Sequence, residues 1–155
     1  MKQIPLTQGK FALVDDADFD WLNQWKWYCL NGAYAARNVY SGKNKKCILM
    51  HREIACTPDG LLTDHRDLDG LNNQRYNLRD ATKSQNGMNR GANKGAESKF
   101  KGVFAKGGRF WGAQIMVNGI LEFRGQYQSE IEAAQAYNEA AIELHGEFAR
   151  LNIIS

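Results

Sequence analysis

One stretch, from His51 to Asn89, constrains this chain most strongly, because it contains little that could build a hydrophobic core. Its centre, residues 64–73, reads DHRDLDGLNN and brings an acid, an imidazole and several amides close together. A segment that only has to fold usually carries more apolar side chains. We therefore interpret the stretch as a functional centre, and the rest of the chain as a scaffold that binds a substrate and holds it against this centre.

The same stretch predicts a small mixed element of strands and helices. Residues 61–63 predict a strand that runs into Asp64 and His65, and turn-forming residues follow directly. The other expected elements are a helix over 50–55 that ends before Pro58, a chain reversal at 72–73, and helices over 74–78 and 80–88. The ionisable groups would then stand at junctions between elements.

These residue types match the requirements of phosphodiester hydrolysis. A neutral imidazole can take a proton from water, which is the role expected of His65. A divalent cation must offset the negative charge of the phosphate, and a hard cation binds carboxylate and amide oxygens. Asp64 and Asn86 are the expected metal ligands, and Asn77 is the expected brace of the imidazole.

Several of these polar residues also have a purely structural interpretation. Asp and Asn favour turns, and we favour that interpretation for Asn72 and Asn73. His51 either packs against or orients the centre from the preceding helix, or takes a direct catalytic role. Arg52, Arg66 and Arg79 either hold a phosphate or are surface charges. The supporting positions considered are His51, Asn73 and Asn89.

Asp64-His65, Asn77 and Asn86 together resemble the ββα-metal motif of HNH endonucleases, and Met50-His51-Arg52 resembles the phage and intron-encoded branch. The resemblance implies that His65 is the general base, that Asp64 and Asn86 bind the metal, and that Asn77 supports the loop. Asn86 stands where other branches carry His, which favours Mg²⁺ or Mn²⁺ over softer ions.

Composition sets mild limits on partners and location. Lys and Arg number 20 against 17 Asp and Glu, and this small excess permits a nucleic-acid partner without demanding one. The three cysteines, Cys29, Cys47 and Cys56, are scattered, so no structural zinc is expected. The chain has no apolar signal core and no membrane-spanning run, which predicts a protein of the cytoplasm, that of a bacterial host if a phage encodes it.

Residues 1–50 predict a β-rich segment, and the tryptophans near its middle are expected to build its core. The expected elements are a hairpin over 3–7 and 11–14, a short helix capped at Asp16 or Asp18, strands over 26–30 and 34–40 joined at Asn31-Gly32, a turn over 41–46 and a strand over 47–50.

Small polar residues around 91–98 predict a linker, after which the pattern changes. The expected elements are strands over 100–106, 110–117 and 120–123, then a helix over 130–144 with a capping box at Ser129 and Glu132 and a cap at Gly146. An alanine-rich stripe on this helix would pack on one face of the sheet, which leaves the other face for a ligand.

This half resembles the plant ethylene-response-factor (AP-two) type of DNA-binding domain, through Lys101-Gly102-Val103, Trp111 to Ile115 and the ending Leu144 to Asn152. That family lays its sheet in the major groove. The residues expected to meet DNA in this half are Lys101, Phe104, Lys106, Arg109, Gln114, Met116 and Arg124. Phe104 and Met116 replace arginines of the plant domains, so the plant sequence preference should not transfer.

The third strand of this sheet leaves two interpretations open. Alignment with the plant domains points Leu121 and Phe123 toward DNA, whereas polarity favours Glu122 and Arg124.

The sequence therefore predicts an α+β protein of two modules. An HNH nuclease module of the ββα-metal type spans 1–92, including the β-rich segment 1–50; a linker spans 93–97; and a three-stranded antiparallel sheet packed on one helix spans 98–155. The expected reaction is hydrolysis of double-stranded DNA to 5′-phosphate and 3′-hydroxyl ends, by a homing-type monomer that nicks. The alternative is a non-catalytic DNA-binding regulator with a silent HNH centre.

Overall fold

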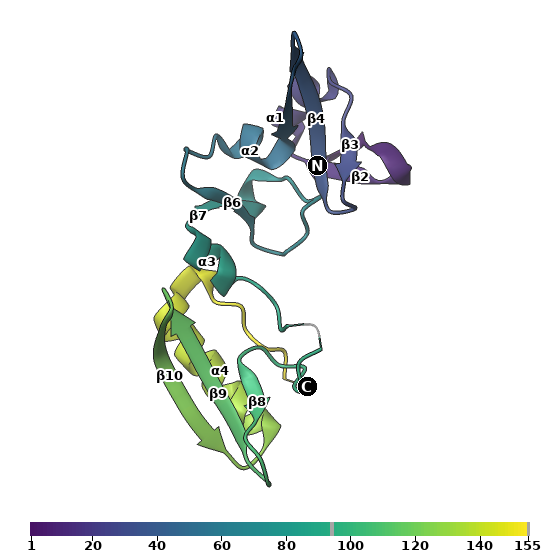
Figure 1. The fold of residues 1–155 in the computed structure, drawn as a ribbon. Coiled ribbons are helices and arrows are strands. Elements are labelled where there is room, and N and C mark those ends of the chain that lie inside the picture. Colours follow the sequence, from purple (N-terminus) through teal and green to yellow (C-terminus); the bar gives the residue numbers. More distant parts are fainter. Residues whose placement is uncertain (94, 155) are drawn as a thin grey trace. The chain divides into compact units, whose positions relative to one another are not determined.

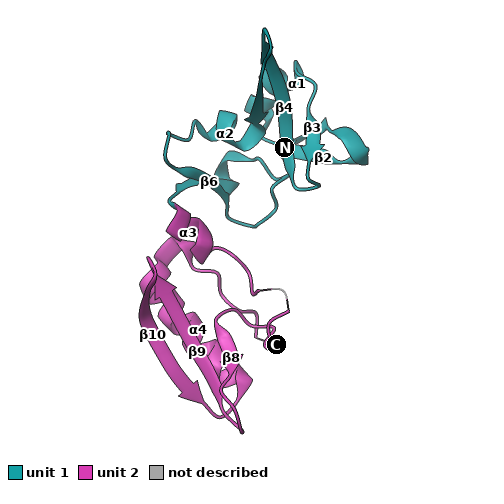
Figure 2. Ribbon diagram, in the orientation of Figure 1, with its two compact units in different colours: residues 1–82 teal, residues 83–155 magenta. Residues whose placement is uncertain are grey.

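The computed structural model describes residues 1–93 and 95–154, and it divides into two compact units, Met1–Thr82 and Lys83–Ser155 (Figure 2). Short antiparallel sheets and a few helices make up both units (Figure 1), in agreement with the predicted α+β class. Helix Lys83–Met88 is grouped with the second unit by its contacts, while the functional boundary predicted at residues 93–97 stays a prediction. No helix in the described residues is both long enough and apolar enough to cross a membrane.

Unit 1, residues 1–82, contains three small antiparallel sheets. The first pairs β1 (Lys2–Pro5) with β2 (Phe11–Val14); the second joins β3 (Tyr28–Leu30), β4 (Tyr34–Ser41) and β5 (Asn44–Leu49); the third pairs β6 (Leu62–His65) with β7 (Leu78–Ala81). The helices are α1 (Asp16–Asn23) and α2 (Met50–Ala55), with 3₁₀ turns η1 (Thr7–Gly9) and η2 (Arg75–Asn77).

All three sheets and both helices contribute to the core of unit 1. Its buried members are Ile4, Leu6, Ala12, Val14, Leu22, Trp27, Cys29, Ala35, Met50, Ile54 and Leu78. The indole Nε1 of Trp27 donates to the carbonyl of Leu22 at 2.8 Å, so this buried ring leaves no polar atom unsatisfied. The core role predicted for the tryptophans holds for Trp27, whereas Trp25 is 45% exposed and carries the Arg37 guanidinium over its ring.

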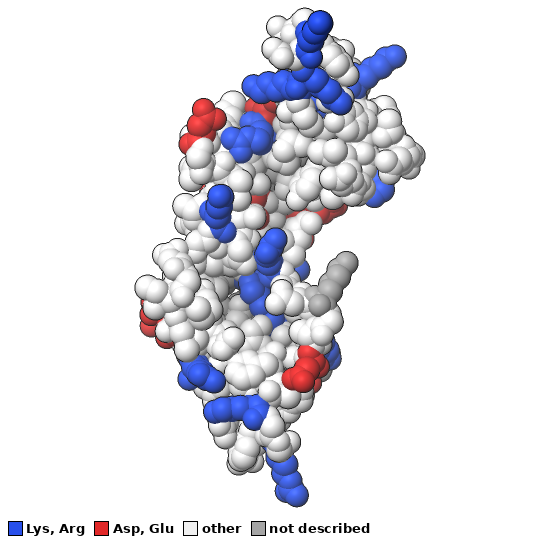
Figure 3. Space-filling model, in the orientation of Figure 1, with Lys and Arg blue, Asp and Glu red and all other residues white. Residues whose placement is uncertain are grey.

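The turn predicted over residues 41–46 was wrong in its length. Ser41 pairs with Asn44, so the chain reverses over two residues, with Gly42 in the left-handed region at φ 59°. Strand β5 therefore extends through the basic run, and Lys43, Lys45 and Lys46 are exposed on this hairpin. Figure 3 shows lysine and arginine side chains gathered at its tip.

The helix predicted over residues 80–88 was also wrong at its start. Residues 78–81 form strand β7, in which Leu78 pairs with His65 and Ala81 with Leu62. Leu78 and Ala81 are buried, so packing of this short strand overrides its weak local preference. Helix α3 (Lys83–Met88) follows only after the strand, and the helix predicted over 74–78 is reduced to η2.

Unit 2, residues 83–155, contains α3, a three-stranded antiparallel sheet and a long helix. The sheet has the order β10-β9-β8, from β8 (Val103–Ala105), β9 (Trp111–Val117) and β10 (Ile120–Tyr127); α4 (Glu130–His145) covers one face, and η3 (Gly146–Phe148) follows (Figure 1). The predicted capping box is confirmed, because Ser129 Oγ accepts from the Glu132 backbone at 3.1 Å and Glu132 Oε2 accepts from the Ser129 backbone at 3.3 Å.

The predicted stripe of α4 forms the core of unit 2. Ala134, Tyr137 and Ala141 are each 2% exposed or less, and they share a hydrophobic cluster with Ala113 and Ile115 of β9. Small side chains let the helix lie close to the sheet. The backbone at Gly102 also lies close to α4: a Cβ at this position would be 2.2 Å from the Tyr137 ring. One face of the sheet is thereby covered, and the other is left to solvent.

Candidate active site

Hairpin β6–β7 presents the two ionisable residues at the centre of the polar stretch. Asp64 and His65 end β6, where they pair with Arg79 and Leu78 of β7. Asp64 is 4% exposed and His65 is 6% exposed. Neighbouring side chains on a strand point to opposite faces, so the carboxylate and the imidazole have different surroundings.

Short polar side chains hold the loop that connects His65 to Asn77. The Asn77 side chain is buried: its Oδ1 accepts from the Asp67 backbone at 3.0 Å, and its Nδ2 donates to Asp67 Oδ1 and to the Asn72 carbonyl, both at 2.8 Å. Asn72 Nδ2 in turn donates to Asp67 Oδ2 at 2.7 Å. These contacts confirm the turn-forming interpretation of Asn72 and place Asn77 as a support of the loop.

The N-terminal segment anchors this loop, a role that no local sequence pattern revealed. The Leu13 backbone of β2 donates to the carbonyl of Leu71 and accepts from the Asn73 backbone, both at 2.8 Å. The Arg75 guanidinium donates to both carboxylate oxygens of Asp18, at 2.8 and 2.7 Å, and this lowers the pKa of Asp18. Unit 1 is therefore one scaffold, in which residues 1–30 fix the position of the loop.

Asn73 determines which nitrogen of His65 carries the proton. The side chain is fully buried, and its Nδ2 donates to the carbonyl of Leu71 at 3.1 Å. This bond orients the amide with its oxygen toward the ring, and Asn73 Oδ1 lies 3.4 Å from His65 Nε2. Because an amide oxygen only accepts, this contact favours the neutral tautomer that carries its proton on Nε2. Asn73 thus orients the ring, and Asn77 supports the loop that carries Asn73.

Two further rings enclose His65. Its ring centroid lies 5.0 Å from that of His51 in α2 and 6.1 Å from that of Tyr34 in β4. His51 is 6% exposed, and its Nδ1 has no hydrogen-bond partner among the described residues. The His51 ring packs edge-on against the imidazole of His65, and the role of His51 in the chemistry stays a prediction.

Burial keeps both imidazoles neutral. It is the main cause that lowers the pKa of His51 to about 3, and the nearby His65 and Arg52 add to the effect. Burial also lowers the pKa of His65, against the opposing influence of the Asn73 hydrogen bond and of neighbouring aspartates. A neutral His65 near pH 7 is in the protonation state that a general base requires.

Arg79 neutralises the buried carboxylate of Asp64. Its Nε and Nη2 both lie 2.8 Å from Asp64 Oδ2, and the side chains are 8% and 4% exposed. Asp64 is a paired, well-oriented buried charge, which is the form in which a carboxylate tolerates burial. The same contact makes Arg79 a buried side chain of the hairpin, whereas Arg66 is exposed.

The expected metal ligands supply the right donor chemistry for a hard ion. Asp64 offers carboxylate oxygens, of which Oδ2 forms the ion pair with Arg79. Asn86 of α3 is half-buried and offers an amide oxygen. The described residues contain no group of three or more His, Cys, Asp and Glu side chains that could hold a metal ion. A hard ion can be held by two protein ligands when water fills its other coordination positions. Because Asp64 belongs to unit 1 and Asn86 to unit 2, the pair stays a prediction. Asn89, also in unit 2, is 3% exposed.

The uncovered face of the unit 2 sheet displays the residues that alternation predicted. Gln114 and Met116 of β9 are exposed, whereas their neighbours Ala113 and Ile115 are buried against α4. Phe104 of β8 pairs with Gly112 and shares this face; its ring lies where a Cβ of Gly112 would be.

A β-bulge in β10 answers the question left open for the third strand. Leu121 pairs with Met116 and Arg124 pairs with Gln114. Glu122 is the extra residue of the bulge, and it shifts by one residue which side chains of β10 point to each face of the sheet. Leu121 and Arg124 therefore share the uncovered face, and Phe123 packs in the core. The face thus holds one residue from each interpretation, Leu121 from alignment and Arg124 from polarity, while their contact with DNA stays a prediction.

The remaining cations predicted to meet DNA differ in exposure. Lys106 and Arg109 are exposed, and Lys106 Nζ donates to Gln126 Oε1 at 2.5 Å. Lys101 is half-buried, and its Nζ donates to the carbonyl of Met88 at the end of α3. Lys101 thus joins α3 to the sheet module within unit 2.

Asp64 and His65 are thus two buried ionisable residues at the end of one strand, on opposite faces of the β6–β7 hairpin. The chain is 34% identical over 153 residues to an uncharacterised HNH endonuclease, L560, of Acanthamoeba polyphaga mimivirus. The match covers 95% of this chain and 77% of the relative. No family model and no solved structure matches the chain. The similarity extends over both units, and the chain belongs to the HNH endonucleases.

Proposed function

We propose that this HNH endonuclease hydrolyses phosphodiester bonds of double-stranded DNA with His65 as the general base. The observation that carries the proposal is the contact between Asn73 Oδ1 and His65 Nε2, because it holds a buried, neutral imidazole with Nδ1 as its basic nitrogen. A base needs both this orientation and this protonation state before water arrives.

In the proposed reaction, His65 Nδ1 takes a proton from a water molecule as the water oxygen bonds to phosphorus. The bond from phosphorus to the 3′ oxygen breaks, and that oxygen takes up a proton to become a hydroxyl. The products are a 5′-phosphate and a 3′-hydroxyl. His51 and Tyr34 exclude bulk water from one side of the ring, which keeps the imidazole in its neutral form.

Asp64 and Asn86 are the ligands we propose for Mg²⁺ or Mn²⁺, since both supply the oxygen donors that hard ions prefer. The ion, when bound, offsets negative charge on the phosphate and on the leaving oxygen. The Asp64 carboxylate is held in place by Arg79, which fixes the direction in which it can bind. Arg79 acts in this proposal through Asp64, and exposed Arg66 is the candidate for direct phosphate contact.

The uncovered sheet face of unit 2 is the proposed DNA reader, of the ethylene-response-factor (AP-two) type. Gln114 and Arg124 form a cross-strand pair on this face and carry the groups that read base edges. Met116 and Leu121, a second cross-strand pair, are exposed apolar side chains. A chain with one catalytic centre cuts one strand per visit, so we propose a monomer that nicks its target in the manner of homing enzymes.

Nicking of supercoiled plasmid in the presence of Mg²⁺ tests the function. Asp64→Asn and Asn86→Ala should each reduce the rate, and raised Mg²⁺ or Mn²⁺ should restore part of it, because each variant weakens an oxygen ligand. Lys10→Met serves as a control, because Lys10 donates to the carbonyl of Gly32 and lies outside the proposed site. A parental protein that binds DNA but leaves plasmid intact with either ion would instead identify a DNA-binding regulator with a silent centre.

A further inference from the structure

Unit 2 contains a cavity that the proposed nuclease chemistry does not use. Its volume is about 400 Å³, and its walls come from α3, the end of α4 and the β9–β10 turn at Asn118 and Gly119. Lys83, Arg90 and Lys101 line it, and none of the described residues around it is acidic. Such a concentration of positive charge without carboxylates favours an anion.

His145 places an unsatisfied polar group in the wall of this cavity. The residue is 8% exposed, and neither ring nitrogen meets a hydrogen-bond partner among the described residues. Burial is the first cause that lowers the pKa of His145, Lys101 lowers it further, and the nearby Met116 carbonyl opposes both. A neutral imidazole always carries one N–H donor, and the Met116 carbonyl does not meet it in hydrogen-bond geometry. Burying that donor without an acceptor is unfavourable, and an anionic oxygen in the cavity would satisfy it.

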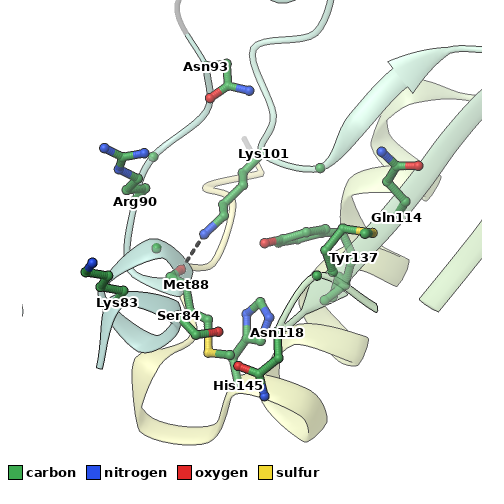
Figure 4. Close-up of a pocket in the computed structure, with 16 residues that line it drawn as sticks. Lys83, Ser84, Met88, Arg90, Asn93, Lys101, Gln114, Asn118, Tyr137 and His145 are labelled. Atoms are coloured by element: carbon green, nitrogen blue, oxygen red, sulfur yellow. Dashed lines mark hydrogen bonds between the residues drawn. The ribbon is translucent and has the colours of Figure 1, made fainter. Parts of the chain in front are cut away.

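Lys101 supplies a directed cation above His145. Figure 4 shows its side chain reaching to the Met88 carbonyl at the end of α3, with His145 among the lining side chains below. An ammonium group has three donors, so two remain for a ligand. Burial, together with repulsion from Arg150, lowers the pKa of Lys101 to about 8, and an anion beside it would oppose both effects.

We propose that this cavity binds a phosphate group, with Lys101 and His145 as its donors and Lys83 and Arg90 at its rim. A metal ion is disfavoured by the surrounding cations, and an apolar ligand would leave His145 and Lys101 unsatisfied. Gln114 and Met116 also line the cavity, so it borders the sheet face proposed to meet DNA. A phosphate of the DNA backbone and a free phosphate compound share this chemistry, and the experiment distinguishes these two sources.

The test is a titration of the full chain, with ¹⁵N-labelled histidine, first with inorganic phosphate and then with a short DNA duplex. The chain has 3 histidines, so the His145 ring signals can be assigned with His145→Phe. His145 signals should move on binding, and Lys101→Met should weaken phosphate affinity about tenfold, as expected for one charge-assisted hydrogen bond. Lys43→Met removes an equal charge from the exposed β4–β5 hairpin, outside the cavity, and should leave phosphate affinity unchanged.

Shifts with both probes would assign the site to the DNA backbone, and shifts with inorganic phosphate alone would assign it to a free phosphate compound. Unmoved His145 signals with both probes, or equal weakening by Lys101→Met and Lys43→Met, would overturn the proposal. His65→Ala should retain the His145 shifts, so failure of the phosphate site and failure of the nuclease proposal are separate results.

Discussion

Acid should destabilise unit 1 through His51, and the size of the effect follows from its burial. The pKa of this imidazole falls from 6.5 to about 3 in the folded protein. A base whose pKa is lowered by folding contributes no penalty above pH 6.5, and it costs stability as the pH falls from there toward 3, because only the unfolded chain takes up the proton. At pH 5 the His51 side chain of the unfolded chain is about 1.5 pH units below its pKa, whereas at about pH 7.5 it is neutral. Its protonation therefore lowers the free energy of unfolding by about 2 kcal/mol between these pH values.

Urea unfolding at these two pH values measures the loss. Three of the four tryptophans, Trp21, Trp25 and Trp27, lie in unit 1, so a Trp111→Phe background restricts the fluorescence signal to that unit. His51→Phe keeps an aromatic ring against Tyr34 and His65 but cannot be protonated, and it should remove the part of the difference that His51 causes, about 2 kcal/mol, leaving the part due to His65. Equal pH dependence in the parent and in His51→Phe would refute the reasoning.

Three further substitutions test the loop, the packing beneath it and the reader. Asn77→Ala removes three hydrogen bonds of a buried side chain and should lower the free energy of unfolding of unit 1 by roughly 2–4 kcal/mol in urea; a loss below about 0.5 kcal/mol would show that the loop does not depend on it. Gly70→Ala places a Cβ 2.3 Å from the Ala33 carbonyl and 2.7 Å from the Tyr34 ring, so it should cost roughly 1–3 kcal/mol and reduce cleavage; a normal melting curve would contradict this packing. Gln114→Ala should relax selection at one base position while leaving the salt dependence of DNA binding unchanged; unchanged selection from a random duplex pool would remove Gln114 from the reader.

Local signals were sufficient for several elements of the fold. Asn31-Gly32 and Asn118-Gly119 predicted tight reversals, and both pairs adopt positive φ between paired strands. The Ser129 capping box predicted the start of α4, because both partners lie within one helical turn. In these cases the residues that decide the structure are neighbours in sequence.

Other features depend on partners that are distant in sequence. Strand β7 forms because Leu78 and Ala81 pair with β6 and pack in the interior, and its four residues carry no strand periodicity of their own. The bulge at Glu122 is a property of the β9–β10 ladder. Asn73 was recognisable as a turn former, but its contact with His65 depends on the backbone bonds from Leu13 that position the loop.

The cleavage rate of His65→Ala is the measurement that tests the central claim most directly. Parental protein and variant would be compared on supercoiled plasmid with Mg²⁺, while affinity for the same duplex is measured by fluorescence anisotropy with Ca²⁺ in place of Mg²⁺. With His65 as the general base, the nicking rate should fall about a hundredfold or more, and duplex affinity should change little, because the imidazole acts on water. Nicking by His65→Ala at the parental rate would contradict the assignment of His65 as the base.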